Sequence, residues 1–480
     1  MEQESVVNIV KKSKDISGWY NSVVEQAKLA EHGPVKGTMV WRPNGYALWE
    51  NAQKELDVRI KKLGVSNVYF PLFIPYDYFN KEADHIKGFS PELAIVTHGG
   101  GEELAEPIVV RPTSETIIFS YFSKWIHSFR DLPMKVNQWC NSVRWEKRLY
   151  YFLRTSEFLW QEGHTAHETF DDAQNMVMQV LSMYESFYKE HFALFGYVGE
   201  KSESEKFAGA DSTYTYEVLM PDGKSVQACT SHNFGQNFAK AFDVKYQSRN
   251  GDLQYVWQTS WGLSNRSLGA LVLAHGDDNG LILPPRVASV KCVVIPVLKS
   301  GSNNKALLSY AHRIEEKLTY LNITTRTDAT EQSVGWKFNQ YDLEGVPIRI
   351  EVGEKEFSST QLKVVVRDNK EVITLNFEEL HQISAILQLM QERLYEKTKD
   401  FTLKNTHEVA TFDQFENIMK TSRGFIKAFW CENSECEEAI KEKTKATTRA
   451  LPLDAIAEAD KKCVYCGREA RHKWIFAQAY

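Results

Sequence analysis

The stretch WCNSVRWEKRLYYFLRTSEFLWQEGHTAH, residues 139–167, is the part of the sequence that determines the fold. It contains two runs suited to β-strands, residues 139–146 and 156–164, separated by a short basic and aromatic loop. Side chains alternate across a strand, so Arg144 and Glu146 are expected to share one face of the first run. The stretch therefore predicts a hairpin with opposite charges on one side.

The second run places three unlike side chains on one face, because Trp160, Glu162 and His164 are each two residues apart. Charged side chains are rarely buried without partners. One interpretation is a two-stranded ribbon with ordinary surface salt bridges, which are common and weak. The other is a surface that holds a charged ligand.

Arg154 lies at the end of the loop between the two runs, and Phe158 follows four residues later. With Arg144-x-Glu146, this arrangement resembles motif 2 of class II aminoacyl-tRNA synthetases. The resemblance implies that Arg144 grips the α-phosphate of ATP, that Arg154 reaches the terminal phosphates and that Phe158 stacks on adenine. The residue types suit this chemistry, since a guanidinium is always charged and its planar fork matches phosphate oxygens.

Length and composition limit the class of protein. The chain has 480 residues, 43% hydrophobic content and a formal net charge of -6, which suits two or three domains and argues against a nonspecific nucleic-acid coat. No apolar run approaches the roughly 20 residues that span a bilayer. The start, MEQESVVNIVKKSKD, lacks a signal-peptide apolar core. We therefore expect a cytoplasmic protein with no membrane partner.

Two other stretches resemble the remaining motifs of the same synthetase class. A predicted helix at 46–62 and a predicted strand at 66–75 that runs into prolines resemble motif 1, which implies a homodimer interface; alone, they are also typical of any helix–strand unit. Ser264 and Arg266 precede a predicted helix that starts near Leu268 and resemble motif 3, whose Arg clamps the γ-phosphate. A helix N-terminus there would add backbone N–H groups and a favourable dipole.

Polar residues between these motifs complete the candidate site. Thr113 and Glu115 share a face where a strand at 105–112 leads into a helix; Glu115 either accepts from a cationic amine or belongs to an ordinary helix cap. On the predicted strand that begins SVQACTSHN, Thr230 and His232 share one face, and Gln227 lies on the other unless a bulge re-aims it.

Several long strings resemble one family more closely, the prolyl-tRNA synthetases of the type shared by archaea, the eukaryotic cytosol and some bacteria. They include ELAEPIVVRPTSET, FLRTSEFLWQEGHTAH, QACTSHNFGQNF and WGLSNRSLGALVLAHGDDNGL. The resemblance implies a multidomain α/β protein. It would have a class II antiparallel sheet flanked by helices at 1–287, a mixed-sheet α/β anticodon-binding domain at 288–400 and a small α+β zinc domain at 401–480.

The resemblance also implies residue roles, carried over position by position. The proline-binding residues would be Thr113, Glu115, Arg144, His232, Phe89, Trp160, Glu162 and His164. The ATP-binding residues would be Arg144, Glu146, Arg154, Thr155, Phe158, Gln227, Thr230, Ser264 and Arg266, of which Arg144 and Arg266 would be catalytic.

The chemistry of such a site is consistent with these residues. Two acidic groups suit the secondary ammonium of L-proline, and a flat aromatic wall suits its ring. The proline carboxylate is ionised at neutral pH and attacks the α-phosphorus of ATP without a general base. Catalysis would rest on positioning and on charge neutralisation by Arg144, Arg266 and Mg²⁺, with Glu146 a candidate metal ligand. The prolyl group would then pass to tRNA(Pro), releasing AMP.

From residue 291 the pattern alternates between strands and helices, which predicts a mixed sheet covered by helices. This region resembles the anticodon-binding domain of class IIa synthetases. The resemblance implies that Asp342, Arg349 and Lys355 read the two guanines of the proline anticodon. An Arg is chemically suited to a guanine edge, and unpaired anticodon bases expose their edges.

Seven cysteines are present, an odd count that argues against a disulfide framework. Two pairs near the end are spaced as zinc ligands, and the alternative is four reduced thiols in a metal-free remnant. The pairs are Cys431-x4-Cys436 and Cys463-x2-Cys466.

Three further expectations follow from the sequence. The residues between Phe158 and Arg266 leave no room for an inserted editing domain. Cys229 and His232 could suggest a thiol nucleophile, but packing of Cys229 is preferred because no further polar partner is evident. Tyr480 resembles a terminal Tyr that reaches the active site in relatives, with a buried and partnered carboxylate, so a C-terminal tag is expected to reduce activity.

Two other functions compete with this interpretation. One is a class IIa synthetase for threonine, histidine or glycine. The other is a synthetase-like RNA-binding regulator without catalysis, which would be expected to lack one of the ATP-gripping arginines, whereas this sequence has all three.

Overall fold

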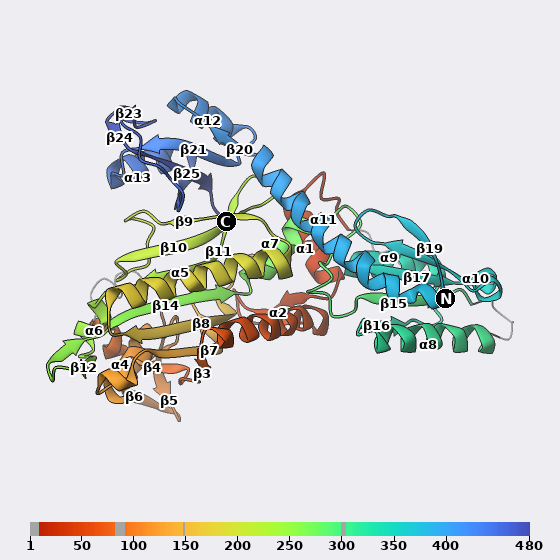
Figure 1. The fold of residues 1–480 in the computed structure, drawn as a ribbon, viewed down its shortest axis with the longest axis horizontal. Helices are drawn as coiled ribbons and strands as arrows, with labels where there is room; N and C mark the ends of the chain where they lie inside the picture. The colour runs from red at the N-terminus through yellow and green to blue at the C-terminus, as the bar shows by residue number, and fades with distance from the viewer. Residues whose placement is uncertain (1–8, 82–91, 147–148, 299–303) are drawn as a thin grey trace.

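The computed structural model describes residues 9–81, 92–146, 149–298 and 304–480. Phe89 lies outside these residues. Figure 1 shows an elongated molecule in which a large sheet occupies one end, a smaller α/β lobe the other, and the chain's C-terminal part stacks above the large sheet. In the part of the chain that is described, no helix is long and apolar enough to cross a membrane.

The large sheet has eleven strands, and six of its ten strand pairs join strands that are not consecutive in the chain, so the sheet is not a simple meander. Pairing is antiparallel except at the two ends, where β3 runs parallel to β7 and β20 parallel to β21. In spatial order the strands are β20 (Thr406–Glu408), β21 (Phe425–Trp430), β25 (His472–Gln478), β22 (Ala446–Pro452), β9 (Gly196–Glu200), β10 (Ser212–Leu219), β11 (Ser225–Asn233), β14 (Trp257–Ser264), β8 (Glu157–His167), β7 (Met134–Val143) and β3 (Ser66–Asn67).

Helices cover this sheet, and one of them, α5 (Phe170–Phe187), lies across β8, β10, β11 and β14 (Figure 1). Thr169 caps α5 by accepting from the Asp172 N–H, and two aspartates in the first turn complement the helix dipole. The helix ends in a wide turn at Tyr188–Phe192, after which Ala193 adopts φ 53°. The other helices of this part are α1 (Ile16–Gln26), α2 (Pro43–Lys62), α4 (Glu115–Trp125), α6 (Asn237–Ala241) and α7 (Arg266–His275).

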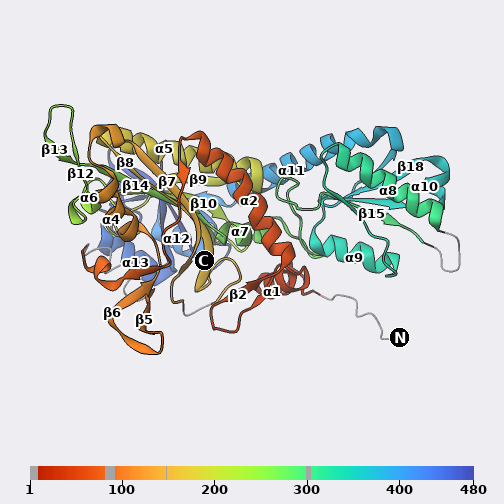
Figure 2. The ribbon, with the colours of Figure 1, turned by 90° about the horizontal axis from the view of Figure 1, so that it is seen from below.

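Small sheets flank the large one, and one of them corrects a prediction. A single strand was expected at 66–75, but two short ones form, β3 and β4 (Phe73–Pro75), because Pro71 and Pro75 lack the N–H that a continuous ladder needs. The strands β5 (Ala94–Gly99) and β6 (Glu102–Val110) join β4 and project as a long hairpin (Figure 2). The remaining small pairs are β1 (Ala30–His32) with β2 (Met39–Trp41), β12 (Lys245–Gln247) with β13 (Leu253–Tyr255), and β23 (Lys461–Lys462) with β24 (Glu469–Ala470).

The second lobe is a five-stranded sheet, and its mixed character confirms the prediction. Two of its four strand pairs are parallel and two are antiparallel, and helices cover both faces of the sheet. The strands in order are β16 (Thr325–Thr327), β15 (Cys292–Pro296), β17 (Ile348–Val352), β18 (Gln361–Val366) and β19 (Val372–Asn376). The helices are α8 (Lys305–Tyr320), α9 (Val334–Glu344), α10 (Glu354–Ser359) and α11 (Ile383–Lys404), which follows a 3₁₀ turn at Phe377–Gln382.

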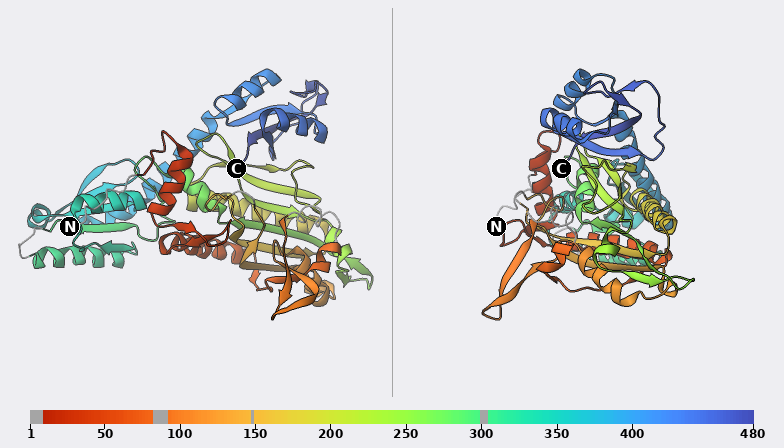
Figure 3. Two further views of the ribbon diagram at one scale, coloured as in Figure 1. Left: turned by 180° about the vertical axis from the view of Figure 1, so that it is seen from behind. Right: turned by 90° about the vertical axis from the view of Figure 1, so that its left-hand side faces the viewer.

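The C-terminal part continues the large sheet instead of standing apart from it. After α11 the chain forms β20, β21, β22 and β25 with the helices α12 (Phe412–Lys420) and α13 (Ser434–Thr444). Leu451 and Pro452 of β22 pair with Glu200 and Gly199 of β9. Figure 3 shows the C-terminal part of the chain, in blue, above the yellow-green strands of the large sheet. Backbone hydrogen bonds therefore run without a break from the first half of the chain into its last residues.

A buried ion pair holds this junction together. Arg449 of β22 donates from Nε and Nη2 to the two oxygens of Glu217 on β10, each at 3.0 Å. The Lys201 ammonium lies 3.2 Å from the same carboxylate. Burial opposes ionisation of Glu217, but the two cations overcome it and lower the pKa of this carboxyl to about 2.

Replacing Arg449 with methionine is expected to destabilise the protein by about 3 kcal/mol, since it removes the bidentate partner of a fully buried carboxylate. Equilibrium urea unfolding measures the effect. Arg471→Met is the matched control, because Arg471 and its partner Glu469 are both exposed, at 71% and 72% of their side-chain surface. Equal, small effects of the two variants would contradict the structural role of Arg449.

Candidate active site

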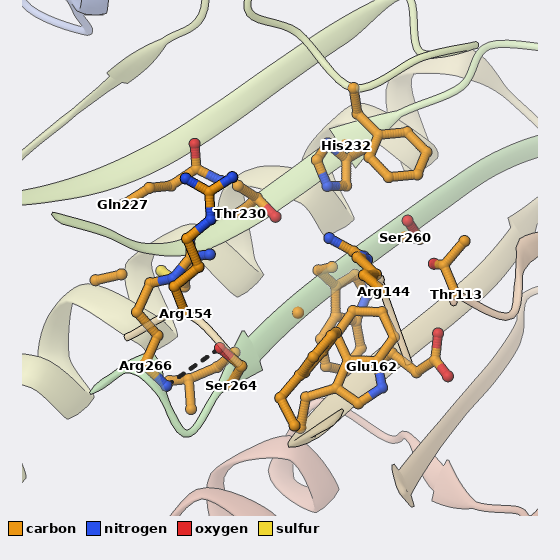
Figure 4. A pocket seen from close by; sticks show the side chains of 18 of the residues that line it. Thr113, Arg144, Arg154, Glu162, Gln227, Thr230, His232, Ser260, Ser264 and Arg266 are labelled. Carbon is orange, nitrogen blue, oxygen red and sulfur yellow. Dashed lines mark hydrogen bonds between the residues drawn. The ribbon is translucent and has the colours of Figure 1, made fainter. Parts of the chain in front are cut away.

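A cavity of about 430 Å³ opens on one face of the large sheet, and four elements supply most of its wall. These are β8, β11, β14 and the first turn of α7, together with the segment that joins β7 to β8. Figure 4 shows Arg154 and Arg266 toward one end and Thr113, Glu162 and Ser260 toward the other, with Arg144 beside this second group. The cavity therefore has a cationic half and an acidic half.

Three arginines form the cationic half. Arg144 donates from Nε to the carbonyl of Pro112 at 3.1 Å, and Arg266 donates from Nε to the carbonyl of Leu153 at 3.1 Å. Arg154 pairs with Glu146 at 2.7 Å. Burial lowers the pKa of Arg144, and burial together with repulsion from Arg144 and Arg154 lowers that of Arg266. Like charges gathered in this way stabilise an anion bound between them.

The position of Arg266 depends on its neighbour Asn265, which the sequence analysis did not identify. The Asn265 side chain accepts from the Leu159 N–H and donates to the carbonyl of Phe152, both at 2.9 Å. Asn265 is fully buried. It therefore ties the start of α7 to β8 and to the segment between β7 and β8, which carries Arg144 and Arg154.

Two buried carboxylates form the acidic half. Glu115 accepts from the Thr113 hydroxyl and, at 3.0 Å, from Ser260. Glu162 accepts from the Gln138 amide at 2.6 Å and lies 3.1 Å from His164 Nε2. Burial opposes ionisation of Glu162, but these partners outweigh it, so the pKa of Glu162 stays below its usual value. The arrangement suits a cation.

Ser114 stands at the N-cap position of α4 but its side chain does not cap the helix. No side-chain hydrogen bond caps this helix, and the Ser114 hydroxyl instead donates to Glu162 at 2.5 Å. His164 is not among the residues that line the cavity; it is fully buried behind Glu162 and meets the Phe119 ring edge-on at 5.6 Å. His164 thus supports the carboxylate from outside the cavity.

A bulge in β11 brings Gln227 to the cavity. Tyr216 of β10 pairs with Cys229, but the next residue, Glu217, pairs with Gln227, so that Ala228 is unopposed. The extra residue inverts the alternation at this point. Gln227 therefore lines the cavity together with Thr230 and His232. The sequence allowed this only if a bulge re-aimed the side chain.

His232 and two aromatic rings bound the acidic half. His232 Nδ1 lies 2.9 Å from the Thr213 hydroxyl, and its ring lies 4.7 Å from the tilted ring of Phe207. Trp160 also lines the cavity. Burial, with the nearby His164 and Arg144, lowers the pKa of His232 to about 3. The imidazole is therefore neutral at physiological pH and offers a flat, uncharged surface.

The sequence did not identify every residue that lines the cavity. Phe207, Ser260 and Glu205 line the cavity without having been identified, since a single Phe or Ser in a loop or strand carries no spacing signal. The remaining predicted residues of the site all line it. They are Thr113, Glu115, Arg144, Glu146, Arg154, Thr155, Phe158, Trp160, Glu162, Thr230, Ser264 and Arg266.

Cys229 behaves as a packing residue. It is buried in the main hydrophobic cluster, and burial raises the pKa of its thiol well above the usual value. A reactive cysteine needs the opposite shift, toward the thiolate. The geometry therefore gives no support to a thiol nucleophile.

Tyr480 reaches the same cavity from the C-terminal part. Its backbone N–H donates to the carbonyl of Ser225 at 3.2 Å, its ring lies 4.7 Å from the Lys224 ammonium, and it meets the Tyr150 ring at 6.0 Å. The side chain is one wall of the cavity. Among the described residues, no ion pair is formed by its carboxylate.

In the second lobe, two of the three predicted anticodon-reading residues are in contact. Arg349 donates from Nη1 to Asp342 at 3.0 Å and lies 4.1 Å over the Phe338 ring. Lys370 also pairs with Asp342, at 2.8 Å. Lys355 is exposed on α10, directly after the strand that carries Arg349.

The four predicted zinc ligands converge. The sulfur atoms of Cys431, Cys436, Cys463 and Cys466 all lie within 4.8 Å of one another, with two pairs at 3.6 Å. Four thiolates around Zn²⁺ at about 2.3 Å are separated by about 3.8 Å, so the set fits a tetrahedral zinc. It is the one such group among the described residues, and it lies in the C-terminal part, outside the cavity.

Stability is expected to fall as the pH is lowered from 7.5 to 5.5, because burial lowers the pKa of four histidines. His167 has a pKa of about 4, and His191, His232 and His275 of about 3. Below the unfolded pKa, the unfolded chain binds protons that the folded chain does not, so each histidine destabilises by about 1 kcal/mol at pH 5.5. Urea unfolding at both pH values measures the loss.

The matched variant for this prediction is His275→Gln. The His275 ring nitrogen Nε2 lies 2.8 Å from the carbonyl of Phe192, a contact that a glutamine amide can replace without titrating. The variant should show a smaller difference between the two pH values. An unchanged difference would mean that His275 is protonated in the folded protein.

Comparisons with known proteins give one consistent result. Residues 98–275 match the family model of the tRNA synthetase class II core domain (G, H, P, S and T), residues 291–385 the anticodon binding domain, and residues 412–480 the prolyl-tRNA synthetase C-terminal model. A proline–tRNA ligase of Chlorobium phaeobacteroides is 48% identical over 98% of this chain and 99% of its own. A proline–tRNA ligase 2 of Bacillus thuringiensis is 46% identical over the whole of both chains.

A solved structure agrees with these relatives. The prolyl-tRNA synthetase of Cryptosporidium parvum, complexed with halofuginone and AMPPNP, superposes with a TM-score of 0.95. It is 39% identical and the match covers 99% of this chain and all of the other.

Proposed function

Because this chain belongs to the prolyl-tRNA synthetase family and is a class II proline–tRNA ligase, we propose that the cavity binds ATP in its cationic half and L-proline in its acidic half. The enzyme activates proline with ATP to prolyl-adenylate and transfers it to tRNA(Pro), releasing AMP and diphosphate. The observation that carries the assignment is the division of one cavity into three arginines and two buried carboxylates.

Arg144 lies where the two halves meet, and this place defines its role. Its guanidinium is held by Pro112 and by the rings of Phe158 and Trp160, at 5.3 and 5.8 Å. From there it reaches both the proline carboxylate and the α-phosphate. Since that carboxylate is already ionised, the step requires alignment and neutralisation of charge. Arg266 neutralises the departing diphosphate at the far end.

Mg²⁺ supplies further charge neutralisation on the phosphates when it is bound. Its protein ligands are oxygen atoms, and Glu146 and Glu92 both line the cavity near the arginines. Glu146 is the residue that we assign to the metal, since its pairing with Arg154 at 2.7 Å keeps it at the phosphate end.

Selection of proline rests on the acidic half. The carboxylates of Glu115 and Glu162 would bind the secondary ammonium, while Trp160, Phe207 and neutral His232 would enclose the ring. The pocket separates proline from a smaller amino acid by only about 1–3 kcal/mol per missing methylene. The residues between β8 and α7, all described, form the elements named above and leave no inserted editing domain.

The remaining assignments belong to the same proposal. Asp342, Arg349 and Lys355 would read the anticodon, and the four cysteines would hold a structural zinc. A homodimer is supported by the short edge strand β3 and by Tyr69 and Phe73, which are 71% and 51% exposed beside it. The proposal also includes the domain divisions at 1–287, 288–400 and 401–480 and the archaeal and eukaryotic-like type. It includes a cytoplasmic location as well, which suits seven cysteines that form no disulfide among the described residues.

Pyrophosphate exchange with each of the twenty amino acids tests the substrate, and Glu115→Gln tests the site. The variant keeps the shape of the side chain but removes a buried charge. We expect the KM for proline to rise about 100-fold while the KM for ATP is nearly unchanged. Glu102→Gln, at an exposed position of the β6 hairpin, is the control. Exchange with another amino acid, or a rise in the KM for ATP alone, would contradict the assignment.

A further inference from the structure

Helix α7 connects the ATP half of the cavity to a distant set of charges. It begins at Arg266, and almost every residue from Ser267 to His275 is buried. Ten residues of α-helix span about 15 Å. A packed helix of this length moves as one piece, so whatever fixes its C-terminal end also influences where Arg266 stands.

A lysine from the N-terminal segment caps that end. Lys12 donates from Nζ to the carbonyls of Leu273 and Gly276, at 2.5 and 2.7 Å. The same ammonium lies 4.8 Å over the Trp19 ring, and a side chain at Gly276 would come within 2.5 Å of that ring. A cation at the carbonyl end of a helix interacts favourably with its dipole. The end of α7 is thus enclosed by residues of the first helical segment.

An arginine from the second lobe holds the next residue along. Arg367, which follows β18 and is 2% exposed, donates from Nη1 and Nη2 to the two oxygens of Asp277, at 2.8 and 2.7 Å. Its Nε donates to the carbonyl of Asp342 at 2.9 Å. All of the Arg367 guanidinium nitrogens are therefore used, and one residue joins the end of α7 to the end of α9.

We infer that Arg367 and Asp277, with Lys12, are positioning residues for proline activation: together they fix the axial position of α7 and thereby hold Arg266 at the phosphates of ATP. This inference rests on the role proposed above for Arg266. The start of α7 is tied to the active-site hairpin by Asn265. Its other end is tied by Arg367, Asp277 and Lys12, which together we call the clamp. The clamp acts in the activation step itself, before any tRNA is bound.

The alternative is that the Arg367–Asp277 pair only docks one lobe on the other. Docking alone predicts lower stability with no preference between substrates. Positioning of Arg266 predicts that binding of ATP suffers and binding of proline does not, because Arg266 lies in the cationic half.

The experiment compares Arg367→Met, Asp277→Asn and the double variant in full-length enzyme, by proline-dependent pyrophosphate exchange without tRNA. We expect the KM for ATP to rise about fivefold to tenfold in each of the three, without addition in the double variant, and the KM for proline to stay within about twofold. Lys12→Met, at the other contact of the same helix end, should raise the KM for ATP in the same way.

The neighbouring pair Asp368–Arg393 provides the matched control. This pair is also bidentate, with both contacts at 2.9 Å, and Asp368 directly follows Arg367 in the chain. Arg393, however, belongs to α11 and not to the end of α7. Arg393→Met should leave both KM values unchanged even where it lowers the melting temperature.

The outcomes separate the inference from the proposal on which it depends. Equal changes in both KM values, or a lower melting temperature with neither KM changed, would overturn the positioning role of Arg367. An unchanged KM for ATP in Arg266→Ala would instead overturn the role of Arg266. If the KM for ATP rose in Arg266→Ala but not in Arg367→Met or Asp277→Asn, the positioning role of the clamp would be rejected and the ATP site would stand as proposed.

Discussion

Replacing Arg144 with alanine is expected to lower kcat/KM of proline-dependent pyrophosphate exchange by about 10⁴-fold. Arg144 is the one guanidinium that borders both halves of the cavity, and burial together with four surrounding carboxylates defines its environment. Without it, the attacking carboxylate and the α-phosphate would approach each other with their negative charges opposed. Most of the loss should appear in kcat, because the interaction is strongest in the transition state.

Two variants make this test specific. Arg144→Lys keeps the charge but not the planar fork, and it should recover only about tenfold of the lost activity. Arg130→Ala removes an exposed arginine from the same domain and should behave as the parent enzyme. If Arg144→Ala retained more than about one tenth of the activity, the alignment of substrates around this residue would be wrong.

Removal of zinc is expected to unfold the C-terminal part of the molecule. Zinc in small thiolate sites contributes on the order of 10 kcal/mol, which exceeds the stability of most domains. Cys431, Cys436 and Cys463 pack in the cluster that contains Phe415, Ile426, Trp430 and Phe476, so loss of the metal would loosen that core. Cys436→Ser should release the metal and abolish the cooperative unfolding of this part, as seen by elemental analysis and calorimetry.

The control for the zinc prediction is Cys292→Ala. Cys292 is buried in the core of the second lobe and takes no part in the cysteine cluster. This variant should keep one zinc per chain. Two results together would show that the cluster is a metal-free remnant. The parent protein, purified without chelator, would contain no zinc, and the Cys436→Ser variant would be as stable as the parent.

The active-site hairpin could be predicted from the sequence because its information is local. Alternation alone placed Trp160 and Glu162 on one face, and the helix predicted to start near Leu268 begins two residues earlier, at Arg266. The sequence allowed a bulge near Gln227 but did not predict it, because the residues around Gln227 do not show which position of the strand is left unpaired. Its effect is large, because one extra residue moves a side chain to the other face.

Contacts between distant segments could not be predicted in the same way. The pairing of β22 with β9 joins Leu451 to Glu200, and neither strand has a pattern that specifies its neighbour. Asn265 has no charge or periodicity that marks it, and its importance is visible only once three segments surround it. Pairs such as Arg367 with Asp277 belong to the same class, since complementary charges are too common in a sequence to identify partners.

The continuity of the large sheet has a consequence for how the chain reaches its native state. The ribosome delivers β9 long before β22, and until β22 arrives, β9 exposes an unpaired edge of backbone groups. Such edges are templates for aggregation, and non-local pairing slows folding. Assembly of the catalytic core is therefore expected to finish only after synthesis of the last strands, with the half-made enzyme depending on chaperones in the interval.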